Sequence, residues 1–326
     1  MEAVIMREYG GPSVLQLESH PDPVERGGWV TVRLEASALN WHDVLVRRGQ
    51  YSSPLPHVPG ADGTGIRTDT GERVVVLPSL GWGERDSAPA AKWEILGDHR
   101  PGTYAELVSV PEDCLFPRPA GLSIPEAAAL SLVGVTTYRA LFTRGHLRAD
   151  EAMLVLGASG GVATAAVSMA SALGASAFVT SSSGDKIRLA QSLGATDGVD
   201  HTAPDWVDRA RALSPSGEGF DLVIDSVGRW NESLGCLRPG GRCVVLGGSV
   251  STRADIDIRA FYFGQYEIIG TTMGSSRDFG EFLKFAADFR LPPPPIDRTF
   301  GLDEAAAAHI RLEAGEGFGK IVLLSA

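Results

Sequence analysis

Hydrophobic and polar positions follow two different patterns along this chain, and the change falls near Pro125. Before it, short β-branched runs such as Val30 to Glu35 and Glu72 to Leu77 lie between glycine and proline breaks, which predicts a mostly β region. After it, short apolar runs alternate with helical patterns as far as Gly270. Alternation of this kind, with brief glycine-containing joints, predicts a parallel, doubly wound α/β sheet.

The second region has the following expected elements. They are helix Pro125–Leu132, strand Met153–Leu156, helix Thr164–Leu173, strand Ala177–Thr180, helix Asp185–Leu193, strand Leu222–Asp225, helix Arg229–Leu237, strand Cys243–Gly247 and, as the sixth strand, Tyr266–Gly270. A helix over Phe279–Phe289 is ended by four prolines. The final helix Leu302–Ala314 and strand Lys320–Leu324 are too small to fold alone, so we expect them to rejoin the β region. The predicted domains are residues 1–121 with 274–326, and residues 122–273.

Three glycines within five residues, Gly157, Gly160 and Gly161, separate the first strand of the sheet from its helix. A strand, a glycine turn and a helix direct free backbone N–H groups toward a pyrophosphate. A tight turn alone would explain one such cluster. Two further strand ends, Asp225 to Gly228 and Gly247 to Ser249, also carry glycine and serine. Ligands of such sheets bind at the carboxyl ends of the strands, so the three ends together predict a dinucleotide site.

The end of the second strand distinguishes the two nicotinamide cofactors. Proteins that bind NAD place an acidic residue there, bonded to the ribose 2′-hydroxyl. Here the strand runs into Ser181-Ser182-Ser183 with Lys186 shortly after, and hydroxyls with a lysine suit a 2′-phosphate. We therefore predict NADPH. Asp185 is the alternative, since a carboxylate turned inward would serve a ribose diol instead.

Composition narrows the class of partner. The 326 residues are 44% hydrophobic and carry a net charge of −11, which argues against a nucleic-acid or acidic-membrane partner because both are negative. The three cysteines are scattered and make neither a disulfide framework nor a zinc cluster. No signal peptide and no membrane-spanning run is visible, so we expect a cytoplasmic protein acting on a small molecule.

Several motifs together resemble one family. In order and spacing the chain is similar to the zinc-independent, quinone-oxidoreductase-like branch of the medium-chain dehydrogenase/reductase superfamily. The matching segments are Ala38-Leu39-Asn40-Trp41-His42-Asp43, Arg47-Arg48-Gly49, Pro59-Gly60-Ala61-Asp62-Gly63, Gly102-Thr103-Tyr104-Ala105-Glu106, Gly134 to Leu141, the glycine turn, and Gly319-Lys320-Ile321-Val322-Leu323. The resemblance implies a GroES-like β domain plus a Rossmann doubly wound parallel sheet, hydride transfer from a nicotinamide, and a homodimer.

The positions that hold zinc in metal-dependent members are altered here. The resemblance places Asn40, Ala61 and Leu132 at the catalytic ligand positions, and none of these is a usable zinc ligand. The lobe that normally carries four cysteines has none between Pro78 and Arg100. We therefore predict no metal. Without a Lewis acid, simple alcohol oxidation loses its main electrostatic support, whereas reduction of a conjugated C=C bond needs only hydrogen-bond donors.

The expected catalytic residues follow from the family positions. Asn40 would donate its amide to a carbonyl oxygen or orient the carboxamide, and Tyr51 would line the substrate pocket as a donor. His42 matches by offset the hydroxyl residue that relays protons in zinc alcohol dehydrogenases, and with a pKa near neutral it would protonate the enolate. A satisfied core or surface histidine is the alternative for His42. This set favours quinones or α,β-unsaturated carbonyls as substrates.

The expected cofactor site spans the second domain. Thr136 is expected at a helix start beside the nicotinamide half. The full set is Thr136, Ala158, Ser159, Gly160, Gly161, Val162, Ser181, Ser182, Lys186, His201, Val227, Gly247, Gly248, Ser249, Thr271 and Met273. Two other functions stay open: a zinc-free alcohol or aldehyde oxidoreductase, and a non-catalytic protein that senses NADPH. As a dimer interface the sequence offers the apolar segments Phe261 to Phe263 and Tyr266 to Ile269, which a buried core would explain as well.

Overall fold

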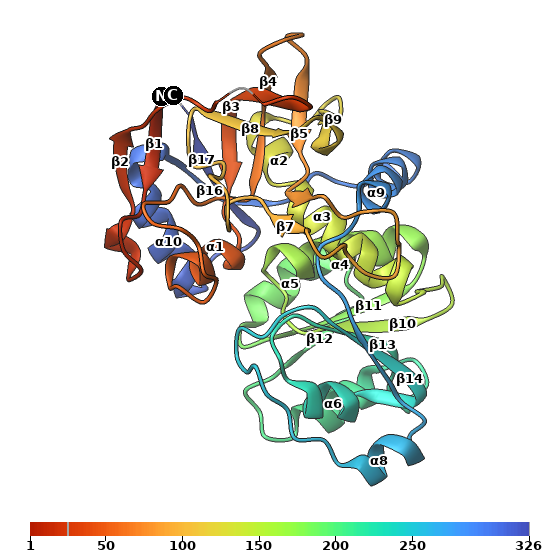
Figure 1. The fold of residues 1–326 in the computed structure, drawn as a ribbon. Coiled ribbons are helices and arrows are strands. Elements are labelled where there is room, and N and C mark those ends of the chain that lie inside the picture. The colour runs from red at the N-terminus through yellow and green to blue at the C-terminus, as the bar shows by residue number, and fades with distance from the viewer. Residues whose placement is uncertain (25, 326) are drawn as a thin grey trace. The chain divides into compact units, whose positions relative to one another are not determined.

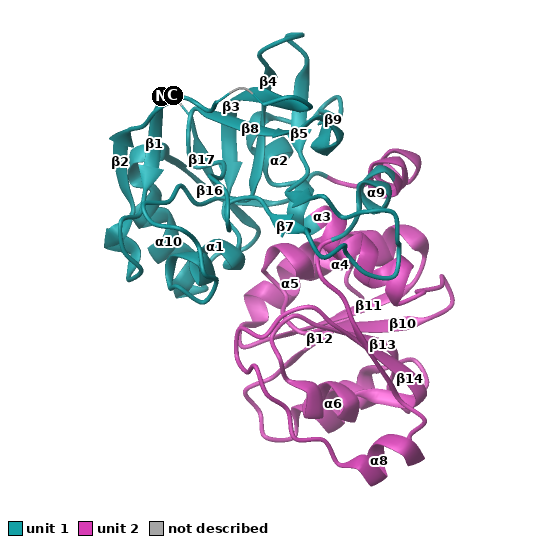
Figure 2. Ribbon diagram, viewed as in Figure 1, with its two compact units in different colours: residues 1–133, 274–280, 293–326 teal, residues 134–273, 281–292 magenta. Residues whose placement is uncertain are grey.

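The computed structural model describes residues 1–24 and 26–325. The chain divides into two compact units (Figure 2). Unit 1 holds residues 1–133, 274–280 and 293–326, and unit 2 holds residues 134–273 and 281–292. The chain passes from one unit to the other inside helices α3 (Ser131–Tyr138) and α9 (Ser276–Asp288), and also between residues 273 and 274 and between residues 292 and 293. No helix among the described residues is long and apolar enough to cross a bilayer.

Unit 2 is a Rossmann-type unit built on six parallel strands in the order β12-β11-β10-β13-β14-β15 (Figure 1). The strands are β10 (Ala152–Val155), β11 (Ser176–Ser181), β12 (Asp197–Asp200), β13 (Phe220–Asp225), β14 (Leu237–Val245) and β15 (Glu267–Gly270). The helices are α4 (Gly161–Leu173), α5 (Gly184–Ser192), α6 (Trp206–Leu213), α7 (Trp230–Gly235) and α8 (Ile258–Phe263), with a π-helical segment η3 (Arg139–Arg144). Every residue of the central strand β10 is buried, as a strand covered on both faces requires.

Unit 1 is built around the long strand β3 (Trp29–Ala38). Its main sheet has the order β16-β17-β3-β4-β5-β9, and β8 also pairs with β3. The remaining strands are β1 (Glu2–Ile5), β2 (Gln16–Ser19), β4 (Asp62–Arg67), β5 (Arg73–Val76), β6 (Ser79–Leu80), β7 (Glu94–Ile95), β8 (Leu107–Pro111), β9 (Leu115–Pro117), β16 (Ile296–Gly301) and β17 (Lys320–Leu324). Helices α1 (Trp41–Arg47), α2 (Ile124–Ala128) and α10 (Ala305–Ala314) complete it, with short 3-10 turns η1 (Pro12–Val14), η2 (Glu112–Cys114) and η4 (Leu302–Glu304).

The expected fold class is confirmed, with a GroES-like domain and a parallel Rossmann-type sheet. The C-terminal strand does return to the N-terminal region, because Val322 of β17 lies opposite Ala38 of β3 in an antiparallel pair. The sequence patterns missed β12, α6, α8 and β16. The strand β12 is short and reads Asp-Gly-Val-Asp at the edge of its sheet, so it lacks the apolar run that marks a buried strand.

Candidate active site

The expected cofactor residues meet at one edge of the unit 2 sheet. Ala158 to Val162 follow β10, Ser181 ends β11 with Ser182 after it, His201 follows β12, Val227 follows β13, Gly247 to Ser249 follow β14, and Thr271 and Met273 follow β15. All six strands are parallel, so their carboxyl ends share that edge. From β10 the chain continues to β11 on one side of the sheet, and later to β13 on the other side. The carboxyl end of β10 is therefore the topological switch point, where ligands of such sheets bind.

The turn after β10 has the geometry of an anion cradle. Gly157 has a φ of +114°, a conformation that favours glycine, and its N–H donates to Thr180 Oγ1 at 3.0 Å. The 13-residue helix α4 begins after Gly160 with no side-chain cap on its first N–H groups. A Cβ atom on Gly160 would meet nothing within 4 Å, so open space lies before the helix. These features fit the pyrophosphate of a dinucleotide.

The end of β11 is polar and is followed by positive charge. Ser181 is buried, and its hydroxyl accepts the N–H of Ser183 at 3.1 Å. Lys186 lies in the first turn of α5, where its N–H donates to Ser183 Oγ. The carboxylate of Asp185 is exposed and pairs with Arg188 one turn later, so it does not turn inward toward a ribose diol. Arg188, which sequence reasoning passed over, neutralises Asp185 in the first turns of α5.

Two other glycine positions have a structural reason of their own. A Cβ atom on Gly247 would lie 2.3 Å from Ser226 O, and one on Gly228 would lie 2.0 Å from Ser251 O. The turns after β13 and β14 are therefore packed backbone against backbone. Asp225 fixes the first of them, because its Oδ1 accepts the N–H groups of Val227 and Gly228 at 2.8 and 2.7 Å. Glycine is needed here for close packing, whether or not a cofactor touches it.

The end of β15 is joined to helix α3. Thr136 is buried inside α3 rather than at the expected helix start, and its hydroxyl donates to Met273 Sδ at 3.7 Å. The expected helix Pro125–Leu132 is in fact α2, and α3 begins only at Ser131. Nearby along the chain, Thr271 Oγ1 is buried and has no hydrogen-bond partner among the described residues. An orphaned hydroxyl at a strand end suits a bound polar ligand.

Asn40 lies in unit 1 and is fully engaged by its own protein. It is the N-cap of α1, directly after β3. Its amide nitrogen donates to Asp62 Oδ2 at 2.9 Å and to Ala38 O at 3.2 Å, and its amide oxygen accepts from Lys320 Nζ. Both amide N–H groups therefore have acceptors already. The expected roles of Asn40, donation to a carbonyl oxygen or orientation of the carboxamide, stay predictions; in this structure its side chain connects Asp62, Ala38 and Lys320.

Lys320 and Asp62 form a buried ion pair around Asn40. The ammonium has three N–H bonds and three acceptors: Leu39 O at 2.7 Å, Asn40 Oδ1, and Asp62 Oδ2 at 3.3 Å. Asp62 Oδ1 accepts the N–H of Leu132 at 2.7 Å. Burial raises the pKa of Asp62 and lowers the pKa of Lys320. The complete set of partners is what a charged pair needs to stay buried.

A chain of hydrogen bonds leads from this pair to the surface of unit 1. Asp43 Oδ2 accepts the N–H of Asn40 at 2.8 Å and the hydroxyl of Tyr104 at 3.1 Å. The same hydroxyl lies 3.2 Å from His309 Nε2, and Arg47 Nη1 lies 3.3 Å from His309 Nδ1. Since an arginine only donates, His309 is neutral with its proton on Nε2. Burial raises the pKa of Asp43 to about 7 and lowers that of His309 to about 3.

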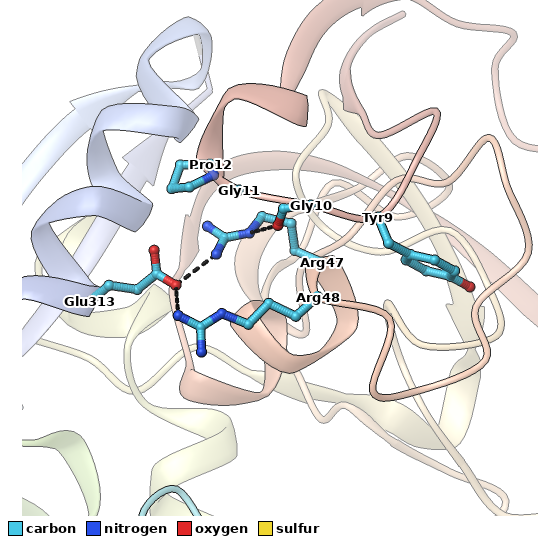
Figure 3. A pocket seen from close by; sticks show the side chains of 7 residues that line it. All are labelled: Tyr9, Gly10, Gly11, Pro12, Arg47, Arg48 and Glu313. Atoms are coloured by element: carbon cyan, nitrogen blue, oxygen red, sulfur yellow. Dashed lines mark hydrogen bonds and ion pairs between the residues drawn. The ribbon is translucent and has the colours of Figure 1, made fainter.

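The chain ends at an open pocket of about 350 Å³. Figure 3 shows Glu313 of α10 facing Arg47 and Arg48 of the α1 end, and its Oε1 pairs with both guanidinium groups. Arg47 is nearly inaccessible and also donates to Gly10 O at 3.1 Å. The pocket holds none of the expected catalytic or cofactor residues. The ion pairs in this pocket connect α1 to α10, and the buried series of hydrogen bonds ends there.

His42 and Tyr51 form a second cluster in unit 1. Their ring centroids are 4.6 Å apart. Burial lowers the pKa of His42 to about 4, with Asp98 opposing the shift, so the expected near-neutral pKa is wrong and the imidazole is uncharged at pH 7. Burial and the charge of Asp98 both raise the pKa of Tyr51. The Tyr51 hydroxyl has no hydrogen-bond partner among residues 1–24 and 26–325, which leaves it able to donate to a ligand.

The positions that the resemblance aligns with zinc ligands hold residues that do not bind zinc. Ala61 is buried beside the Asp62 carboxylate, and Leu132 contributes its backbone N–H to that carboxylate. The described part of the chain contains no group of three His, Cys, Asp or Glu side chains that could hold a metal. In the lobe without cysteines, Trp82 and Trp93 meet edge to face at 5.8 Å, and Trp93 donates to Ser79 Oγ at 2.8 Å. Packing of aromatic rings holds this lobe.

Comparison with known proteins places the chain in a family. The model of the alcohol dehydrogenase GroES-like domain matches residues 26–120, and the model of the zinc-binding dehydrogenase matches residues 161–288. Quinone oxidoreductase from Mus musculus is 31% identical over 99% of the chain and 98% of that protein. The 2-methylene-furan-3-one reductase of Solanum lycopersicum is 31% identical over 99% of the chain and 79% of that protein.

A solved structure agrees with the fold over the full length. The crystal structure of an NAD-dependent alcohol dehydrogenase has a TM-score of 0.93 and 36% identity, and the match covers 100% of both chains. Together with the two domain models, these relatives define an oxidoreductase of the medium-chain type. The protein belongs to the medium-chain dehydrogenase/reductase superfamily as a quinone-oxidoreductase-like member, which confirms the resemblance seen in the sequence.

Proposed function

We propose that the protein uses NADPH to reduce quinones or α,β-unsaturated carbonyl compounds, and that it does so without zinc. The observation that carries the proposal is the pair Lys320–Asp62 with Asn40, which fills the family's first metal-ligand position with a fully bonded amide. Ala61 and Leu132 offer no metal-binding side chain at the other two positions. The mouse quinone oxidoreductase and the tomato furanone reductase support a substrate with a conjugated carbonyl.

The choice of NADPH rests on the end of β11. Ser181 and Ser182 at the end of β11 and Lys186 in the first turn of α5 are the residues we propose to bind the 2′-phosphate. The carboxylate of Asp185, one residue before Lys186, is paired with Arg188. A bound nicotinamide supplies hydride, and the residues of this chain hold the phosphates and donate hydrogen bonds to the substrate oxygen on which charge develops. Tyr51 is the donor we propose, with the neutral His42 ring packed against it.

Consumption of NADPH and NADH over a panel of quinones, enones, aldehydes and ketones tests this function. We expect turnover of quinones or enones, a preference for NADPH, and no effect of a chelator. Turnover of aldehydes alone would support the alternative, a zinc-free alcohol or aldehyde oxidoreductase. The similarity to the NAD-dependent alcohol dehydrogenase structure is the observation that favours this alternative. Binding of NADPH with no turnover of any compound would support the sensor, and loss of turnover in chelator would refute the zinc-free mechanism.

We also propose a homodimer formed through unit 2. The strand β15 is the last of its sheet, and its outer edge pairs with no other strand in the described parts of the chain. The adjacent helix α8 exposes Ile258, Tyr262 and Phe263 at 76%, 51% and 69%. An open strand edge beside exposed apolar side chains favours pairing with a second copy.

The three cysteines are free thiols, so we assign the protein to the reducing cytoplasm.

A further inference from the structure

Asp98 is a buried carboxylate in unit 1 that belongs to neither the Lys320–Asp62 pair nor the expected site residues. The side chain of Asp98 is 8% exposed, and it lies after β7 in the lobe of unit 1 that lacks cysteines. Its Oδ1 accepts the hydroxyl of Ser53 at 3.3 Å and lies 3.8 Å from Nδ1 of the exposed His99. Burial of a carboxylate costs free energy, so such a group is usually hydrogen-bonded, paired with a cation or part of a functional site. A single serine hydroxyl at 3.3 Å compensates little of the free energy that burial of this carboxylate costs.

The Ser53 contact connects Asp98 to the turn that carries Tyr51. Ser53 N donates to Tyr51 O at 2.9 Å, which closes the turn. From the other side, the hydroxyl of Tyr9 donates to Ser53 O. Ser53 is therefore held at its carbonyl by Tyr9 and at its hydroxyl by Asp98. The phenol ring of Tyr51 in turn packs on His42 of α1. These contacts fix the backbone and the ring of Tyr51 while leaving its hydroxyl unbonded.

The segment that holds Asp98 is itself rigid. A Cβ atom on Gly97 would lie 2.3 Å from Gly60 O, so the two backbones are in direct contact. His57 Nε2 donates to Gly97 O at 2.9 Å and ties the segment to the strand-like region before Gly60. The backbone N–H of Asp98 donates to Ile95 O at 3.2 Å. A carboxylate held this firmly keeps a constant distance from its neighbours.

We propose that Asp98 is a positioning residue for Tyr51, whose turn it anchors through the hydroxyl of Ser53. The inference rests on the proposed function, in which Tyr51 donates to the substrate oxygen. The groups that face this cluster are His42 from α1, His57 and His99 from the loops on either side, and Asp98 itself. Burial and Asp98 act in the same direction on Tyr51, since both disfavour a phenolate.

The decisive experiment is a titration of Tyr51 in the cofactor-free full-length protein labelled with ¹³C at tyrosine Cζ. Tyr51→Phe assigns the resonance. In Asp98→Asn we expect the Tyr51 pKa to fall, because the charge of Asp98 is one of the two causes that raise it. Asp98→Glu, which keeps the charge, should leave the Tyr51 pKa close to that of the parent. The exposed Asp288→Asn is the matched control for charge and should change nothing.

A Tyr51 resonance that titrates alike in the parent and in Asp98→Asn would overturn the inference. If Asp98→Asn does not fold, by far-ultraviolet circular dichroism, Ser53→Ala takes its place: it keeps the charge and removes the anchor, so kcat/KM for an enone should fall about tenfold with the Tyr51 pKa unchanged. An unchanged kcat/KM in Ser53→Ala would also overturn the anchoring role. The titration needs no turnover, so a failed proposed function would show as an inactive enzyme in which Tyr51 still responds to Asp98.

Discussion

The Nζ atom of Lys320 lies 3.3 Å from Oδ2 of Asp62, with the two side chains only 5% and 0% exposed. Both residues begin strands that run antiparallel to β3, so the carboxyl end of β3 brings together β4 and β17 from distant parts of the chain. Asn40 follows that end and bonds to both. An internal ammonium is thus bonded to Asn40, the residue that the resemblance aligns with the first zinc-ligand position.

Removal of the ammonium should destabilise the protein strongly. Lys320→Met leaves Asp62 as a buried charge without its counterion, and we expect the free energy of unfolding to fall by about 3–5 kcal/mol. Urea denaturation followed by fluorescence measures it, with the exposed Lys92→Met as the control. Adding Asp62→Asn to Lys320→Met should recover part of the loss, because the uncompensated charge is then gone. A loss below about 1 kcal/mol in Lys320→Met would mean that the pair is not charged.

Stability should also depend on the protonation of Asp43. Burial raises its pKa from 3.8 to about 7, so the folded protein binds this proton more tightly than the unfolded chain. The resulting stability is fully present below pH 4 and is lost as the pH rises through 7, by as much as about 4 kcal/mol. Asp43→Asn keeps an acceptor for Asn40 and Tyr104 but cannot ionise. Relative to the parent, this variant should therefore gain stability from about pH 4 to about pH 7 and gain no more above that.

Chemical denaturation of both proteins at several pH values measures this difference. The lowered pKa of His309, about 3, produces an opposite slope between pH 6.5 and pH 3, but it is common to parent and variant and cancels when they are subtracted. The exposed Asp288→Asn should track the parent at every pH. If the difference between Asp43→Asn and the parent stays constant across this range, Asp43 is not the group that titrates.

The cofactor preference should depend on two cations of α5. Lys186→Ala removes charge at the proposed 2′-phosphate site, so the KM for NADPH should rise ten- to hundredfold while the KM for NADH stays within about twofold. Arg188→Ala should weaken NADPH less, and by freeing Asp185 it should improve NADH. Initial-rate kinetics with each cofactor measure both values. Lys284→Ala on α9 is the control, and an equal rise in the two KM values for Lys186→Ala would contradict the assignment.

The sequence was informative where one segment carries the whole signal. The apolar run ending at Gly157, with Gly160 and Gly161 after it, located β10, the cradle and α4 because all three are contiguous. The same holds for the hydroxyls after β11. Nothing local indicated the Lys320–Asp62 pair, whose members stand 258 residues apart. Lys320 reads as an ordinary charge before an apolar strand until β17 is placed beside β3.

Burial was the other quantity that the sequence could not supply. The sequence predicts an ordinary, near-neutral pKa for His42, because nothing local shows that the ring is buried. Burial in the fold lowers this pKa to about 4. Asp98 gave no signal at all, because its segment resembles the flank of a lobe whose cysteines are missing. Its importance depends on the approach of Gly97 to Gly60, a contact that follows from the fold alone.

The oligomeric state gives the last prediction. The proposed dimer pairs the outer edge of β15 with its copy and buries the exposed face of α8, whose Phe263 is 69% exposed in the single chain. Phe263→Asp places a charge in that interface, so we expect the dissociation constant to rise more than a hundredfold, since an unpaired charge buried between two copies is costly. Sedimentation velocity at several concentrations should show dimers for the parent and monomers for the variant. Val24→Asp, at an even more exposed apolar position of unit 1, should remain dimeric. A parent that sediments as a monomer at every concentration would rule the interface out.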